Sequence, residues 1–327
     1  MPTHYGDVAA ECQAARTGTA LRDASHWGRL YIRGADHLDF LHRMTTNNFQ
    51  HLQPGRGLEA VFIEQRARIL DLGVFYRGED RTLLVVNPQS RSQIPAWLDR
   101  FIFAEAIEFE DATETTAMLE CCGPQAAELV RAITGFDLTL TNKDQLLTPQ
   151  TDGDLWLARE DWGGHPGLRA IGPPSELAKL WEQLTASGAH PLGETAWEIL
   201  RVEWGIPLFG REMTEDYNPW EAGLGRAIHM DKGCYIGQEV IARLDTYDKV
   251  KQHLVGLRLP EGDLPNPGQP LRGEKREVGR ITSAVDSPLL GPIALAYVRR
   301  DSCAPGTCLD LDGAAVEVTP LPFPTPA

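Results

Sequence analysis

The sequence predicts an α+β protein that ends in a small β-barrel, and three observations lead to this fold class. Strand-like and helix-like stretches alternate up to Lys249 without the regular strand–helix–strand repeat of a doubly wound sheet. Two strand–glycine–helix segments resemble each other at a fixed spacing. After Lys249 the pattern changes to short strands separated by turns, which is typical of a barrel or sandwich.

The length of 327 residues is enough for two or three domains at roughly 100–200 residues each. We expect residues 1–248 to form one region that contains two α+β modules, which can interleave. Residues 249–327 are expected to form the C-terminal β-barrel domain.

The two similar segments run from Leu30 to Thr45 and from Leu119 to Thr134. Each begins as a short strand, reaches a glycine (Gly34 or Gly123) and continues with apolar residues at helical spacing. The two glycines are 89 residues apart, and so are the two final threonines. The pattern indicates a duplicated module. The alternative is that any strand–glycine–helix pair would look this similar.

The remaining elements follow from periodicity and turn residues. In the first module we expect strands at 57–63, 69–76 and 81–86 and a helix at 90–101. In the second module we expect a helix at 177–184, and Thr195 and Glu198 have the spacing of a capping box that opens another helix. In the barrel, strands are expected within 253–259, 278–285, 292–297 and 309–318.

The chain is acidic, with a formal net charge of −15. Such a chain is a poor general binder of nucleic acid, because affinity for phosphates comes from clustered Lys and Arg. We therefore expect no direct nucleic-acid partner. The N-terminus lacks a basic start followed by an apolar run, and no apolar stretch approaches the ~20 residues that span a bilayer. The sequence thus predicts a cytoplasmic protein without a membrane partner.

Six cysteines in a chain of this size do not make a disulfide scaffold. Cys303 and Cys308 lie close in sequence but have no Cys/His partner pair nearby, so we expect no metal site.

The densest run of glycines and paired polar residues lies between Glu198 and Arg243. The glycines let the backbone approach a ligand closely or adopt positive φ. The polar side chains could grip a flat heterocycle; they are Arg201, Glu203, Arg211, Glu212, Glu221, Gln238 and Glu239.

Cys234 lies between Gly233 and Gly237, just ahead of a predicted helix that starts at Gln238. A thiol ahead of a helix N-terminus and near a lysine such as Lys232 is readily ionised and reactive. The alternative is a buried packing residue, which is the usual fate of a free cysteine. Spacing alone favours the packing residue.

The run from Lys232 to Glu239, KGCYIGQE, resembles the signature of the YgfZ family, folate-binding proteins related to the aminomethyltransferase (T-protein) of the glycine cleavage system. The similarity extends through most of the chain. It includes 34–36, 40–42, 45–48, 68–71, 198–212, 279–283 and 294–298.

The resemblance implies a ring-like fold of two ferredoxin-like modules and a C-terminal barrel around a central folate pocket. The implied cofactor is tetrahydrofolate or a one-carbon derivative, and Cys234 is implied to be tied to activity. The residues expected to bind the cofactor are Arg201, Glu203, Arg211, Glu212, Lys232, Gly233, Tyr235, Gly237, Gln238 and Glu239.

Two positions bear on which branch of this group the chain resembles. Members usually have a glycine before the arginine of the second strand, whereas this chain has Ala67. Asp71 falls where the aminomethyltransferases have a catalytic aspartate that many YgfZ proteins lack. The alternative for Asp71 is a surface carboxylate that pairs with Arg66 or Arg68.

Three functions follow as hypotheses. The first is a folate-binding protein that supports assembly or repair of Fe–S enzymes, including tRNA-modifying ones, as indirect clients. The second is a folate-dependent aminomethyltransferase or other one-carbon transferase, with Asp71 as base or electrostatic partner. The third is a non-catalytic interaction module that has lost its ligand. A monomer is expected in each case.

Overall fold

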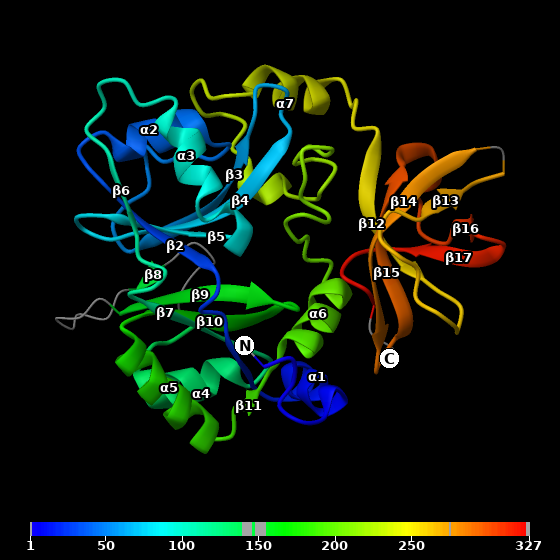
Figure 1. Cartoon of the computed structure of the whole chain (residues 1–327), viewed down its shortest axis with the longest axis horizontal. Coiled ribbons are helices and arrows are strands. Elements are labelled where there is room, and N and C mark those ends of the chain that lie inside the picture. Colours follow the sequence, from blue (N-terminus) through cyan, green and yellow to red (C-terminus); the bar gives the residue numbers. More distant parts are fainter. Residues whose placement is uncertain (1, 139–145, 148–154, 275, 325–327) are drawn as a thin grey trace. The chain divides into compact units, whose positions relative to one another are not determined.

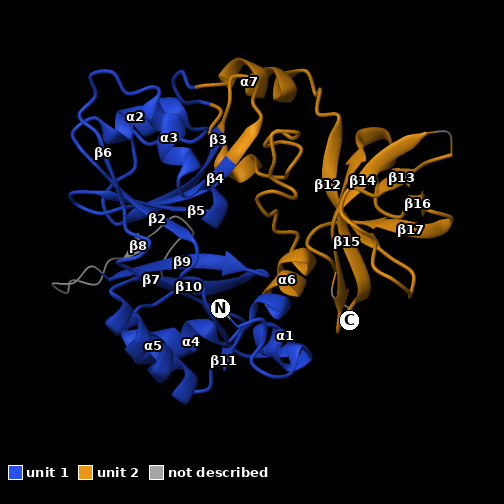
Figure 2. Ribbon diagram, viewed as in Figure 1, with its two compact units in different colours: residues 1–62, 71–196, 231–235 blue, residues 63–70, 197–230, 236–327 orange. Residues whose placement is uncertain are grey.

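The chain divides into two units, each made of separate stretches of sequence (Figure 2). In this computed structural model, residues 2–138, 146–147, 155–274 and 276–324 are described. Unit 1 comprises residues 1–62, 71–196 and 231–235, and unit 2 comprises residues 63–70, 197–230 and 236–327. The predicted domain boundary after residue 248 stays a prediction.

The first sheet has the strand order β3-β4-β5-β2-β6. Strand β2 is antiparallel to both β5 and β6. The elements of this module are β2 (Gly28–Arg33), α2 (His37–Met44), β3 (Arg56–Ile63), β4 (Ile69–Arg77), β5 (Thr82–Val86), α3 (Gln93–Asp99) and β6 (Glu108–Asp111). The predicted strands are confirmed, whereas the helix expected at 90–101 is shorter, because a separate 3₁₀ turn (Pro88–Ser90) precedes it.

The second sheet has the strand order β11-β1-β7-β10-β9-β8. Helices α4 and α5 contribute Val130 and Leu180 to a core shared with Leu119 and Leu168 of the sheet. The elements are α1 (Val8–Thr17), β1 (Ala20–Asp23), β7 (Ala117–Cys122), α4 (Ala126–Thr134), β8 (Leu146–Leu147), β9 (Trp156–Trp162), β10 (His165–Gly172), α5 (Pro174–Ala186) and β11 (His190–Pro191).

The two modules share one plan, which supports the duplication. The chain order strand, helix, three strands, helix, strand occurs in both, from β2 to β6 and from β7 to β11 (Figure 1). The strand order within the sheets also corresponds, with β1 inserted between β7 and β11. The glycines that follow β2 and β7 have nearly the same conformation, with φ of 106° at Gly34 and 113° at Gly123.

The two sheets of unit 1 pack against each other. Tyr76 and Leu83 of the first sheet share an apolar cluster with Met118, Trp156 and Ile171 of the second. Burial of this kind contributes about 25 cal/mol per Å² of apolar surface, so the shared cluster holds the two modules together as one unit.

In unit 2, the closed barrel has the strand order β12-β15-β14-β13-β16-β17, and β17 pairs back with β12. Its interior is apolar, with Leu257, Ile281 and Val318 among the buried residues. The strands are β12 (Gln252–Arg258), β13 (Pro270–Arg272), β14 (Glu277–Ser287), β15 (Gly291–Arg299), β16 (Cys308–Leu311) and β17 (Ala314–Thr319). The predicted stretch 309–318 is two strands in the structure, β16 and β17, and the short β13 was not predicted.

Helix α6 (Glu194–Glu203) carries Arg201 and Glu203, and helix α7 (Gln238–Thr246) carries Gln238 and Glu239. The capping-box prediction is wrong in its position, because α6 already begins at Glu194 and Thr195 lies inside its first turn. In the part of the chain that is described, no helix is long and apolar enough to cross a membrane.

Candidate functional site

Lys232 lies buried in unit 1, where its ammonium group closes the C-terminal end of helix α2. Nζ donates hydrogen bonds to the backbone oxygens of His42, of Thr45 at 2.7 Å and of Asn47 at 2.6 Å. Carbonyls at a helix end lack intrahelical partners and carry partial negative charge. Burial lowers the pKa of Lys232 to about 7, and the carbonyl contacts oppose that shift because they favour the ammonium. Since an ammonium has three N–H groups, Lys232 has none left for a ligand.

The segment around Lys232 presents Cys234 at the surface. The Cys234 side chain is exposed, so the packing-residue alternative is wrong. The ring of Tyr235 lies 4.6 Å from Lys232 Nζ, and burial raises the pKa of Tyr235 to about 12. Gly233 runs close to α2, since a Cβ there would lie 3.4 Å from His42 Nε2. An exposed thiol therefore stands two residues from a buried, fully hydrogen-bonded lysine.

Asp71 is fully buried on strand β4 of unit 1. Its Oδ1 accepts hydrogen bonds from Leu72 N (2.8 Å) and Asn87 Nδ2 (2.7 Å), and its Oδ2 accepts one from Asn87 N (3.1 Å). Burial raises the pKa of Asp71 to about 6, although the hydrogen bonds oppose that shift. The alternative of a surface pair with Arg66 or Arg68 is wrong, because the carboxyl is buried and Arg68 donates to Asp216 O.

Arg201 lies at the centre of a buried network in unit 2. Its five N–H groups donate to Glu198 (2.7 and 2.6 Å), Glu212 (3.0 Å), Ser283 Oγ (2.6 Å) and Ile206 O (3.3 Å). The side chain of Arg201 is 1% exposed and that of Glu212 is 0% exposed. Burial lowers the pKa of Arg201, but the carboxylates of Glu198 and Glu212 more than offset this and raise it.

Both carboxylate oxygens of Glu212 also accept hydrogen bonds from within the protein. Its Oε2 also accepts from Leu208 N at 3.0 Å, and its Oε1 accepts from Ser283 Oγ at 2.6 Å. Because Ser283 lies on barrel strand β14, the network fastens helix α6 and the following loop to the barrel. Arg201 and Glu212 thus support the fold, and neither has a free group of the kind that sequence reasoning assigned to ligand binding.

The other predicted residues of unit 2 differ in exposure. Glu203 is buried and accepts from Ser287 Oγ at 2.5 Å. Arg211 is 41% exposed along its side chain and donates to Glu198 at 2.6 Å. At the start of α7, Gln238 is half-buried and Glu239 is exposed. Gly237 takes the left-handed conformation (φ 78°), and a Cβ there would lie 2.8 Å from Glu64 O, which explains why this position is a glycine.

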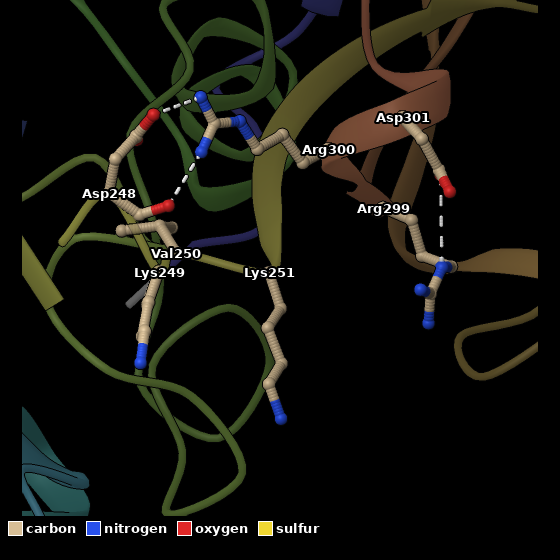
Figure 3. Close-up of a pocket in the computed structure, with 7 residues that line it drawn as sticks. All are labelled: Asp248, Lys249, Val250, Lys251, Arg299, Arg300 and Asp301. Carbon is tan, nitrogen blue, oxygen red and sulfur yellow. Dashed lines mark hydrogen bonds and ion pairs between the residues drawn. The ribbon is translucent and has the colours of Figure 1, made fainter.

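A separate open pocket of about 550 Å³ lies in unit 2 (Figure 3). Arg300 pairs there with Asp248, and Arg299 Nε lies 3.8 Å from Asp301 Oδ1. Its other lining residues are Lys249, Val250 and Lys251. The predicted cofactor residues all belong to the described part of the chain, and none of them lines this pocket.

A buried charged network in unit 1 was missed by sequence reasoning. Arg169 donates to Glu120 (2.9 Å), Glu160 (3.1 Å) and the hydroxyl of Tyr76 (3.0 Å), and Arg22 pairs with Glu120 at 2.9 Å. Tyr76 belongs to the first sheet and the others to the second, so the network links the two modules. The sequence feature that could have revealed this network is Glu120, a charged residue within the apolar run of β7. Among the described residues, no three His, Cys, Asp or Glu side chains are placed to hold a metal ion.

Comparison with known proteins extends this description. A family model described as the GCVT N-terminal domain matches residues 1–232, and one described as the glycine cleavage T-protein C-terminal barrel domain matches residues 252–324. An aminomethyltransferase of Thermus thermophilus is 33% identical over 99% of this chain and 92% of that protein. A putative chloroplastic transferase of Arabidopsis thaliana is 32% identical over 92% of this chain and 71% of that protein.

A solved structure agrees with these matches. The crystal structure of the glycine cleavage system aminomethyltransferase T from Bartonella henselae aligns with a TM-score of 0.88 at 26% identity, over 99% of this chain and 91% of that one. The chain is therefore a mixed α/β protein with a closed C-terminal barrel, as predicted. It belongs to the glycine cleavage T-protein family. The matches name that family and not YgfZ, so the narrower resemblance stays a prediction.

Proposed function

We propose that the chain binds tetrahydrofolate and transfers a one-carbon unit to it, as an aminomethyltransferase-like enzyme. One observation carries this proposal: both T-protein family segments and relatives named aminomethyltransferase cover nearly the whole chain. The same matches give no support for Fe–S enzyme maturation as the main function. When bound, tetrahydrofolate would supply the nitrogen atoms that accept the one-carbon unit.

The residues predicted to bind the cofactor fit this ligand in part. Arg201 and Lys232 would have to break internal hydrogen bonds to reach it, because all their N–H groups are used within the protein. Arg211, Gln238 and Glu239 retain accessible polar groups that could hold the pterin or the glutamate tail. We therefore assign ligand contact to these three, and a supporting role to Arg201 and Lys232.

Asp71 is proposed to act electrostatically. Its carboxyl changes protonation near pH 6, and its full burial removes the solvent that would weaken its field. A fixed carboxylate in such surroundings stabilises positive charge that develops on a reacting nitrogen. Burial also argues against direct proton exchange with solvent, so the electrostatic role is favoured over that of a general base.

The test is a transfer assay with the full chain, tetrahydrofolate and a lipoyl carrier loaded with methylamine. We expect formation of methylene-tetrahydrofolate, its loss in Asp71→Asn, and its retention in Cys234→Ala. Asp39→Asn is the matched control, because Asp39 is an exposed carboxylate of the same unit. The absence of any product with the unaltered protein would contradict the proposal.

A second candidate is a YgfZ-like role in maintaining Fe–S enzymes. Cys234 favours it, because this exposed thiol stands in the signature run and the transferase proposal gives it no task. In cells that lack the native protein, Cys234→Ala should fail to restore Fe–S-dependent tRNA thiomethylation. Full restoration would remove this candidate.

A further inference from the structure

The segment Asp231–Tyr235 reaches unit 1 from a distant part of the sequence and ends on helix α2. Lys232 is separated by 190 residues from His42, by 187 from Thr45 and by 185 from Asn47, and it bonds to the backbone oxygens of all three. The segment has no strand or helix of its own. Side-chain contacts therefore hold the segment on α2. Among the described contacts, the three hydrogen bonds of the Lys232 ammonium contribute most to this.

These contacts have a particular geometry. The three acceptors are backbone oxygens at one helix end, so they point together at a single donor group. The lysine is 7% exposed, while Gly233 and Cys234 beside it are exposed. The Tyr235 ring lies 4.6 Å from Nζ and covers the ammonium from its own segment. The Lys232 side chain therefore anchors the segment to α2, and the exposed thiol of Cys234 lies two residues further along the chain.

We propose that Lys232 is a positioning residue for Cys234: its ammonium fastens the segment Asp231–Tyr235 to the C-terminal end of α2 and so fixes where the thiol lies. This assignment holds whichever of the two functions above is correct, because it concerns the placement of the thiol and no reaction. It also explains why a lysine in a ligand-binding motif has no group left for a ligand. Arginine can replace lysine here in charge, whereas methionine matches its length but has no donor.

The experiment attaches a nitroxide spin label to Cys234 of the full chain. Cys303→Ser and Cys308→Ser first remove the two other thiols that are not buried. We expect a restricted label in this background, a severalfold faster label motion in Lys232→Met, and a return to slow motion in Lys232→Arg. Lys249→Met is the matched control, since it removes a lysine of unit 2 and should leave label motion unchanged.

Far-UV circular dichroism separates a local effect from unfolding, because a merely structural loss would alter the whole spectrum. Equal label motion in Lys232→Met and the background protein, with both folded, would overturn the proposal. If Lys232→Met fails to fold, Lys232→Gln takes its place with the same expectation. Fast label motion in the background protein itself would also overturn the proposal, since the thiol would then not be fixed.

Discussion

Replacing Arg201 with methionine tests whether this residue supports the fold or binds the ligand. The substitution keeps an extended apolar side chain but removes all five N–H donors. Glu212, which is fully buried, then loses its cation, and Ser283 loses one of its partners.

The magnitude follows from burial. Breaking a buried ion pair by removing one partner costs about 3–5 kcal/mol, because the remaining charge is left uncompensated. The matched control is Arg211→Met, which removes a half-exposed cation that bonds to the same Glu198. Exposed pairs are worth about 0.2–1 kcal/mol, so this variant should lose far less stability.

The assay is urea unfolding followed by circular dichroism, with both variants, the single variant Glu212→Gln and the double variant Arg201→Met/Glu212→Gln. We expect the double variant to lose less than the sum of the single losses, because the two residues interact directly. If Arg201→Met loses no more stability than Arg211→Met but binds tetrahydrofolate more weakly, the structural assignment is refuted and Arg201 contacts the ligand.

Three further outcomes are expected. Gly34→Ala and Gly123→Ala should each lose several times more stability than Gly135→Ala in thermal unfolding. A Cβ would lie 1.9 Å from Ala106 O at Gly34 and 2.5 Å from Gly18 O at Gly123, whereas at Gly135 it meets nothing within 4 Å. Equal losses in the three variants would contradict this prediction. Ala67→Gly should raise stability by at most about 1 kcal/mol. The φ of 58° costs a residue other than glycine roughly 1–2 kcal/mol, but the substitution also removes a fully buried methyl group worth about 0.8 kcal/mol. A clear loss of stability in urea unfolding would count against this prediction. The pKa of Asp71 is about 6 in the folded chain, against an ordinary value of 3.8. Between these two values the folded state binds more protons than the unfolded state, so the free energy of unfolding should fall as pH rises through that window. At about 1.4 kcal/mol per pKa unit, the total fall is at most roughly 3 kcal/mol. The Asp71→Asn variant should lack this part of the pH dependence of stability. If the slope of stability against pH is the same in the variant, Asp71 is not its source.

The fold was largely predictable because its signals are local. The glycines that follow β2 and β7 mark the same backbone conformation in both modules, and helical spacing after each gave the helix. At Ala67, where members of the family usually have a glycine, the structure shows a positive φ of 58°, which the sequence analysis did not predict. The short β13 was not predicted because it has only three residues, the first of which is Pro270, and so carries no periodicity.

The candidate site was predictable in its residue types but not in its roles. A sequence shows that Arg201, Glu212 and Lys232 are polar and grouped, yet it does not show that their hydrogen-bonding groups are already filled. That depends on Ser283, which is 82 residues from Arg201, and on the end of α2, which is at least 185 residues from Lys232. The burial of Asp71 was missed for the same reason, since its partner Asn87 comes from the end of the neighbouring strand.

The most direct test of the central claim is calorimetric titration of the purified full chain with tetrahydrofolate under anaerobic conditions. We predict saturable heat with one ligand bound per chain, and weaker binding in Arg211→Met than in Lys249→Met. The absence of saturable heat would contradict the claim that this member of the T-protein family is a tetrahydrofolate-dependent protein.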